Sequence, residues 1–315
     1  MTDFDSAGPF GELHRLREAT ARRDWRAVSA HFDGLTSADD HEFAASIVVD
    51  VPGVDDFLRD AVEWERGTGR TLARALHADR LISAGWEVRT SRLAKDVSRE
   101  QFAVFHSYLR RAERILIEVT AEDPANPTAW TARLTARRGL QLGQAEARRR
   151  YDRCARHLPH FYWAQVMYKE QLYKKWGGED ERALAFAREC LRAAPPGSLA
   201  ALTVIWVHLE VGRGSGGDWD DRSAIVRYLQ RPDVWADLEE AANRSVRHPA
   251  FDPGRYNWYH AHSVFAAVFG AAGALAAARP HFQAIGEHPM AASAWGTFGR
   301  PAEVFHDLRS RVMGA

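Results

Sequence analysis

Apolar residues recur every three or four positions along most of the chain, which is the spacing of one face of an α-helix. The pattern predicts an all-α fold, with helices over 11–33 (broken near Arg23–Asp24), 40–50, 54–66 and 71–86, almost continuously over 101–248, and over 256–279. One or two further helices follow. Ile47–Val51 is the one β-like run, and it is too isolated to pair with another strand.

One complete helical hairpin is predicted over residues 157–198. Its first helix runs from Phe161 to Trp176 and ends at Gly177–Gly178, because glycine can adopt the left-handed backbone of a helix end. Its second helix begins at Glu179 and Asp180, with negative charge at the positive end of the helix dipole. A hairpin with apolar faces on both helices needs neighbouring helices to bury them.

An internal repeat is marked by prolines 35 and 36 residues apart, at Pro124, Pro159 and Pro195. Small residues stand at fixed distances before each proline, where they would let the two helices of a hairpin pack closely. Twelve residues before the prolines stand Ala112, Ala147 and Ala183, and five before them stand Val119, Cys154 and Cys190.

This pattern resembles the tetratricopeptide repeat family, whose period is about 34 residues. The resemblance covers residues 105–200, although the Leu-Gly pair of the family's first helix is missing. It implies a right-handed α-solenoid of helical hairpins. The expected organisation is an N-terminal helical region (1–100), a repeat core (101–248) and C-terminal hairpins on the same solenoid (249–315).

A narrower resemblance rests on Lys175-Trp176-Gly177-Gly178, followed by an Ala-Phe-Ala-Arg run at 185–188. These residues look like an uncharacterised bacterial helical-repeat family. That family has no established activity to carry over, so this resemblance implies kinship and no chemistry.

Charge is balanced, with 42 basic and 42 acidic residues, so no global field favours nucleic acid or an anionic membrane as a partner. No run of 18 apolar residues predicts a transmembrane helix, and the first 30 residues do not read as a signal peptide. The expected location is the cytoplasm.

Three sets of residues have the spacing or the chemistry of a cofactor, metal or nucleophile site. Gly212, Gly214 and Gly217 have dinucleotide-fingerprint spacing, but a helical segment precedes them and aspartates follow, so the interpretation is a flexible loop. His157 and His160 have a spacing that a metal could use, but they straddle a helix start. The two cysteines are interpreted as core residues, and no metal or cofactor is expected.

The repeat resemblance implies that the first helix of each hairpin lines a concave groove. Counting from the marker prolines, the predicted groove residues are Thr135, Arg138, Trp163, Met167, Glu170, Tyr173, Trp206, Asn257 and His260. This mainly aromatic set with a few polar groups suits an apolar peptide or a small molecule. The family's carboxylate clamp is not predicted, because it needs several lysines and asparagines and only Asn257 is available.

The predicted function is therefore an interaction module that binds a protein or peptide segment in the groove. The alternative is a small-molecule binder or an enzyme that uses the same groove, with His260 or Glu170 as the proton-transfer group. His208 could share a face with His260, and the competing interpretation of these histidines is packing in the core.

Overall fold

The computed structural model describes residues 4–90, 96–214 and 222–314, and within these ranges the chain is helical and contains no strand. The all-α prediction is confirmed. The chain forms two compact units. The first unit is Gly11–Gln171, and the second unit comprises residues 4–10 and the described residues from Leu172 onward. The division falls inside the predicted repeat core.

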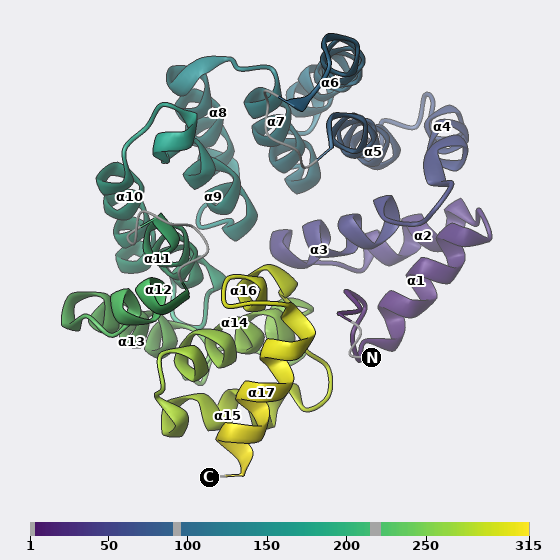
Figure 1. The fold of residues 1–315 in the computed structure, drawn as a ribbon. Helices are drawn as coiled ribbons and strands as arrows, with labels where there is room; N and C mark the ends of the chain where they lie inside the picture. The colour runs from purple at the N-terminus through teal and green to yellow at the C-terminus, as the bar shows by residue number, and fades with distance from the viewer. Residues whose placement is uncertain (1–3, 91–95, 215–221, 315) are drawn as a thin grey trace. The chain divides into compact units, whose positions relative to one another are not determined.

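The described helices of the first unit follow one another with short connections (Figure 1). They are α1 (Gly11–Ala21), α2 (Trp25–Asp33), α3 (Ala38–Val49), α4 (Val54–Trp64), α5 (Leu72–Arg89), α6 (Arg99–Glu122), α7 (Pro127–Gly139), α8 (Gly143–His157) and α9 (Tyr162–Lys169).

Several helix starts in the first unit are set by side chains that accept hydrogen bonds from otherwise unpaired backbone amides. Asp24 accepts from the amide of Ala27 and begins α2. Ser98 and Gln101 form a reciprocal capping box at α6. Asn126 accepts from the amide of Ala129 and begins α7, whose first residue is a proline.

The core of the first unit forms where α5, α6 and α7 pack against one another. Phe105 and Leu109 of α6 are buried there. A Cβ atom on Gly139 of α7 would lie 2.3 Å from Leu109 and 2.6 Å from Phe105. Glycine at this position therefore allows the end of α7 to approach α6 closely.

The second unit is also built of packed helices (Figure 1). Its described elements are the short 3₁₀ helices η3 (Lys174–Trp176) and η4 (Leu199–Leu202), and the α-helices α10 (Asp180–Ala193), α11 (Thr203–Gly214), α12 (Arg222–Leu229), α13 (Pro232–Arg244), α14 (Asn257–Ala271), α15 (Leu275–Ile285), α16 (Ala292–Gly296) and α17 (Pro301–Met313).

The predicted long helix over 256–279 is two helices. Gly273 ends α14 with a φ of 82°, and the amide of Ala274 donates back to the carbonyl of Phe269. This is the hydrogen bond of a left-handed helix cap. The turn was not predicted because the sequence around it is rich in alanine. It lets α15 fold back against α14.

The predicted helix from Phe161 to Trp176 is also interrupted. The α-helix α9 ends at Lys169, and the short 3₁₀ helices η2 (Glu170–Leu172) and η3 follow. Tyr173 between them has an extended backbone, with ψ of 153°, which no α-helix can contain. Gly177 then ends η3 with a φ of 78°, as the predicted turn requires.

The β-like run Ile47–Val51 lies mostly within α3, where Ile47, Val48 and Val49 are buried. Because α3 is buried on several sides, a helix accounts for this continuous apolar run and a strand is not required. In the described ranges, no helix is long and apolar enough to cross a membrane.

Candidate binding surface

In the first unit, α3 packs against α5, α7 and α9. These three helices therefore share a surface that already holds a helix of the same chain (Figure 1). The residues of α3 that follow its first turn, from Phe43 to Val49, are mostly buried. The polar contacts of α3 are concentrated in that first turn.

Asp39 anchors α3 to the start of α9. Its Oδ1 accepts a hydrogen bond from the amide of Tyr162, the first residue of α9, at 3.1 Å. Its carbonyl oxygen accepts one from the indole nitrogen of Trp163 at 3.3 Å. Since Phe161 cannot cap α9 with its own side chain, the carboxylate of Asp39 supplies the anionic cap from another helix. Trp163, a predicted groove residue, therefore contacts α3.

A polar stripe runs along α7, where Thr128, Thr131, Thr135 and Arg138 are three or four residues apart. The Oγ1 of Thr128 lies 3.4 Å from Nδ1 of His41 on α3, and the hydroxyl of Thr131 donates to the carbonyl oxygen of Pro127 at 3.1 Å. The Oε2 atom of Glu42 is buried and has no hydrogen-bond partner in the part of the chain that the structure describes. Asp79 of α5 acts on the same carboxyl with a second negative charge.

The other end of the stripe, formed by Thr135 and Arg138, lies near Trp86, Met167 and Glu170. The Oγ1 of Thr135 lies 3.3 Å from the sulfur of Met167, and Cζ of Arg138 lies 5.4 Å from the ring centroid of Trp86. Glu170 acts electrostatically on Arg138. We call these five half-buried residues the Arg138 patch: Trp86, Thr135, Arg138, Met167 and Glu170.

The charges of the Arg138 patch are partly compensated. Nζ of the buried Lys169 lies 2.6 Å from Oε1 of Glu170. Burial lowers the pKa of Arg138, and the negative charge of Glu170 opposes that shift. Lys169 and Glu170 therefore form an ion pair beside the guanidinium of Arg138.

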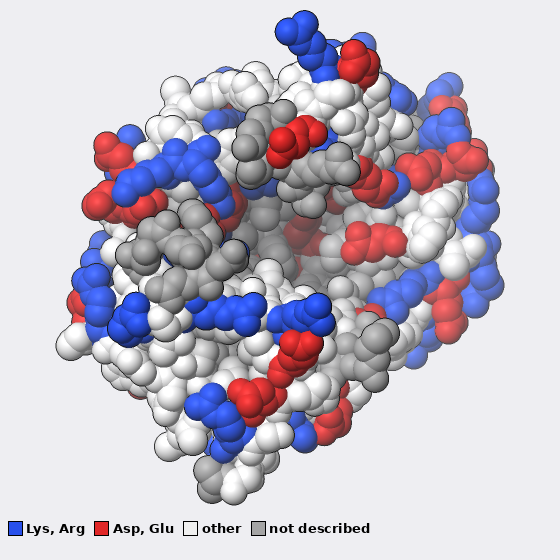
Figure 2. Space-filling model, in the orientation of Figure 1, with Lys and Arg blue, Asp and Glu red and all other residues white. Residues whose placement is uncertain are grey.

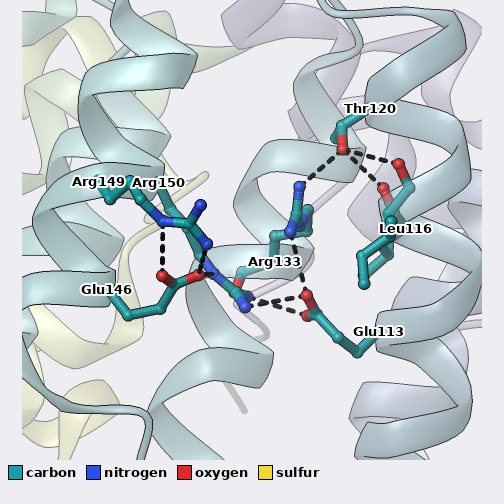
Figure 3. Close-up of polar contacts among 8 residues, drawn as sticks. Glu113, Leu116, Thr120, Arg133, Glu146, Arg149 and Arg150 are labelled. Atoms are coloured by element: carbon teal, nitrogen blue, oxygen red, sulfur yellow. Dashed lines mark hydrogen bonds and ion pairs between the residues drawn. The ribbon is translucent and has the colours of Figure 1, made fainter.

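A buried ion-pair network connects α6, α7 and α8 (Figure 3). Arg133 and Arg150 both point toward Glu113, with nitrogen–oxygen distances of 3.1 Å and 2.9 Å. Arg133 also donates to Thr120 at 2.8 Å, and Arg150 donates to Glu146 at 2.7 Å. Because Glu113 bridges two buried guanidinium groups, and Arg150 is also paired with Glu146, this network joins the three helices that carry it.

The remaining predicted groove residues, Tyr173, Trp206, Asn257 and His260, belong to the second unit. The hydroxyl of Tyr173 lies 3.5 Å from the carbonyl oxygen of Trp206. The ring centroids of Trp206 and His260 are 6.0 Å apart. Tyr173 is 1% and Asn257 0% exposed, so their side chains pack inside this unit. Trp206 remains half-buried.

The two predicted proton-transfer groups have different surroundings. Burial lowers the pKa of His260 to about 4, so its imidazole is neutral at pH 7 and is a weak base. Glu170 is paired with Lys169, which stabilises its charged form. A pKa of about 4 keeps the imidazole of His260 away from neutral pH, whereas a general acid or base usually titrates near neutral pH.

His208 is fully buried in the second unit and joins three helices. Its Nδ1 lies 2.9 Å from the hydroxyl of Tyr228, and its Nε2 lies 3.0 Å from Oδ2 of Asp237. Arg188 donates to the same carboxylate at 2.7 Å. Burial raises the pKa of Tyr228 to about 12, so its phenol stays neutral. Both nitrogens of the imidazole therefore have partners. Since Arg188 lies on α10, the whole cluster connects α10, α11, α12 and α13.

The glycine and cysteine residues singled out in the sequence lie within helices or outside the described residues. Gly212 and Gly214 belong to α11, and Gly217 lies outside the described residues. Cys154 and Cys190 are buried. Burial raises the pKa of Cys154 to about 12, which keeps the thiol protonated. No group of His, Cys, Asp and Glu among the described residues is arranged to hold a metal ion.

Asp39, Glu42, Asp79 and Trp86 were not predicted as site residues. Acidic residues near the start of a helix ordinarily face water and stabilise the helix dipole, so Asp39 and Glu42 carried no signal of burial. The repeat register also began at residue 105. It therefore could not place α3 or α5 beside α7.

The face of the molecule shown in Figure 2 carries basic and acidic side chains side by side. This distribution agrees with the balanced composition of 42 basic and 42 acidic residues. No protein-family model matches this chain, and no curated protein matches its sequence.

Proposed function

We propose that this protein is a helical-repeat interaction module, with tetratricopeptide-like hairpins stacked in a right-handed solenoid, that binds a segment of a protein partner. The observation that carries the proposal is the position of α3 across α5, α7 and α9. In a repeat of hairpins, the first helices share one face, and that face binds extended or helical segments. A surface that already accepts a helix of its own chain suits that role.

The partner segment would bind at the Arg138 patch, beyond the part of the surface that α3 covers. Met167 packs on a core cluster that includes Trp130 and Leu134, so its half-exposed side chain offers a supported apolar contact. Trp86 offers an aromatic contact beneath the guanidinium of Arg138. Arginine and tryptophan at a partly buried surface are the residue types that contribute most to binding.

The chemistry of the patch selects the kind of segment. Its apolar floor favours an apolar side chain, and the guanidinium of Arg138 favours a carboxylate of the segment placed near it. An apolar segment with one acidic residue therefore fits this surface better than a basic segment does.

Native mass spectrometry of the protein purified from its own host tests the proposal. We expect a bound polypeptide, and we expect Arg138→Glu to lose it while keeping the parent's melting temperature within a few degrees. Glu118→Lys on the exposed side of α6 is the matched charge-changing control and should retain the polypeptide.

Two outcomes would contradict the proposal. A small molecule retained in place of a polypeptide would favour the alternative function as a small-molecule binder or an enzyme. A polypeptide retained equally by the parent and by Arg138→Glu would place the binding surface elsewhere on the chain.

A further inference from the structure

Two histidines of the second unit meet where α15 folds back against α14. The Nδ1 atoms of His262 on α14 and His281 on α15 lie 3.0 Å apart, which is a hydrogen-bond distance. Both rings are buried, with 7% of His262 and 2% of His281 exposed. The contact therefore joins the two helices through one buried polar group on each.

Aromatic rings surround the two histidines. The ring of His281 stacks with Phe265 and Phe269 of α14, whose ring centroids lie 5.4 Å and 5.7 Å away. The ring centroid of Trp258 lies 4.2 Å from that of His262. These contacts fix the positions of both imidazoles, so that the separation of their Nδ1 atoms is set by the packing of the helices.

The contact requires a proton on one of the two Nδ1 atoms only, because a neutral imidazole has one N–H and one lone pair. Nε2 of His281 is buried and has no hydrogen-bond partner in the part of the chain that the structure describes. Buried donors without a partner are rarer than buried acceptors without one. The proton of His281 therefore lies on Nδ1 and is donated to Nδ1 of His262, which carries its own proton on Nε2.

This packing does not accommodate a further proton. On Nδ1 of His262 it would place two N–H groups against each other and break the hydrogen bond. On Nε2 of His281 it would create a buried cation whose new N–H has no acceptor. Stacking on phenyl rings offsets part of that cost, but burial still lowers the pKa of His262 to about 4 and that of His281 to about 3.

The nearest charge is unfavourable to a protonated pair. Arg247, which follows α13, lowers the pKa of His281 further through its positive charge. Its guanidinium is paired with Glu239 of α13 at 2.6 Å. The carboxylates of α14, α15 and the loops beside them, Asp252 and Glu287, are exposed at the surface.

Other elements packed against α14 and α15 add little charge near the pair. The short helices η4 and α16 carry no titratable side chain. The titratable side chains of α17 are exposed except Arg309, which pairs with Glu287 at 2.6 Å. The other basic groups on α14, α15 and the loop before α14 that are at least half-buried are His248, Arg255, His260 and Arg279.

We propose that the His262–His281 pair is an acid-sensitive switch between α14 and α15. The neutral pair keeps α15 packed on α14, and proton uptake by either ring lets α15 separate. Once separated, both rings reach water and regain their ordinary pKa of about 6.5. His260 is not part of the switch, because residues two apart on a helix do not share a face, and its ring lies beside Trp206 of α11.

The lowered pKa values set the pH range of the switch. A histidine whose pKa is lower in the packed state than in the open state stabilises packing fully above its open-state pKa of about 6.5. That stabilisation is lost as the pH falls from about 6.5 through the packed-state values of about 4 and about 3. The switch is therefore closed at neutral pH and weakens in mild acid.

Hydrogen exchange of the full chain, followed by mass spectrometry, tests this proposal. Peptides covering α15 should lose protection by about a hundredfold between pH 7.5 and 5.5, after correction for the intrinsic exchange rate. Each of the two histidines changes the opening equilibrium by about tenfold per pH unit below pH 6.5. Peptides covering α8 in the first unit, which carries no buried histidine, should change much less.

Asparagine variants isolate the pair, because the asparagine amide can occupy the position of Nδ1 but does not titrate. His281→Asn should reduce the change in α15 protection to about tenfold, since one titrating ring remains. The double variant His262→Asn with His281→Asn should make protection nearly independent of pH. His288→Asn, at an exposed histidine just after α15, is the matched control and should behave as the parent.

Nitrogen NMR of the parent chain with labelled histidines keeps the test decisive if the variants do not fold. In the folded chain at pH 5.5, the rings of His262 and His281 should both be neutral. Protection of α15 that is equal at pH 7.5 and 5.5 would overturn the proposal. A ring of the pair that becomes charged near pH 6.5 while α15 stays protected would overturn it as well.

Discussion

Gly177 and Gly178 meet two different constraints within the same turn. Gly177 has a φ of 78°, and a Cβ atom there would meet open space. Gly178 has no positive φ, but a Cβ atom there would lie 2.1 Å from the carbonyl oxygen of Leu172. The first glycine is needed for its backbone conformation and the second for a close backbone approach.

These constraints predict an order of stability. Gly178→Ala should lower the free energy of unfolding by about 1–3 kcal/mol, because the turn must move away from the new methyl group. Gly177→Asn should cost less than about 1 kcal/mol, because asparagine tolerates the left-handed region. Urea unfolding of both variants measures the difference, and a parent-like Gly178→Ala would refute the close approach.

Asp39 gives a second prediction at the residue scale. Asp39→Ala removes the side-chain cap of α9 and should cost about 1 kcal/mol. Asp39→Asn keeps an acceptor oxygen and should cost less, although it loses the favourable charge at the helix start. Equal loss in both variants, measured by urea unfolding, would assign the effect to the charge and would contradict a role for the hydrogen bond to Tyr162.

Among helices, the network around Glu113 determines how α6, α7 and α8 pack. Glu113→Ala would leave the buried guanidinium groups of Arg133 and Arg150 without their shared carboxylate. Loss of one partner of a buried ion pair costs about 3–5 kcal/mol.

Glu118→Ala, on the same helix but exposed, is the control for this prediction and should change stability by less than about 0.5 kcal/mol. Thermal unfolding of the two variants should therefore differ clearly. Similar melting temperatures would show that the network contributes little to the packing of these three helices.

Helix positions were largely predictable from the sequence, and helix interruptions were not. The break at Arg23–Asp24 was readable because Asp24 is a strong helix cap. The helix breaks at Tyr173 and Gly273 were not predicted, because the apolar spacing continues on both sides of each. Tertiary contacts determine where these helices end, since Tyr173 is buried and α15 folds back on α14.

At the scale of the whole molecule, the chain divides into two compact units, and the predicted groove residues divide with it. The repeat register assigned Arg138, Met167 and Glu170 to one predicted groove, and in the structure all three belong to the first unit. The register could not show that Tyr173 and Asn257 would be buried, since burial depends on neighbours far apart in the sequence.

The central claim is that a protein segment binds at the Arg138 patch, and site-specific photo-crosslinking tests it most directly. A photoreactive amino acid at Met167 should capture one polypeptide in host cells, and Arg138→Glu in the same chain should abolish this capture. The same photoreactive group at Arg156, exposed near the end of α8, is the control and should capture nothing specific. Capture at Arg156 equal to that at Met167, or capture at Met167 that survives Arg138→Glu, would contradict the account.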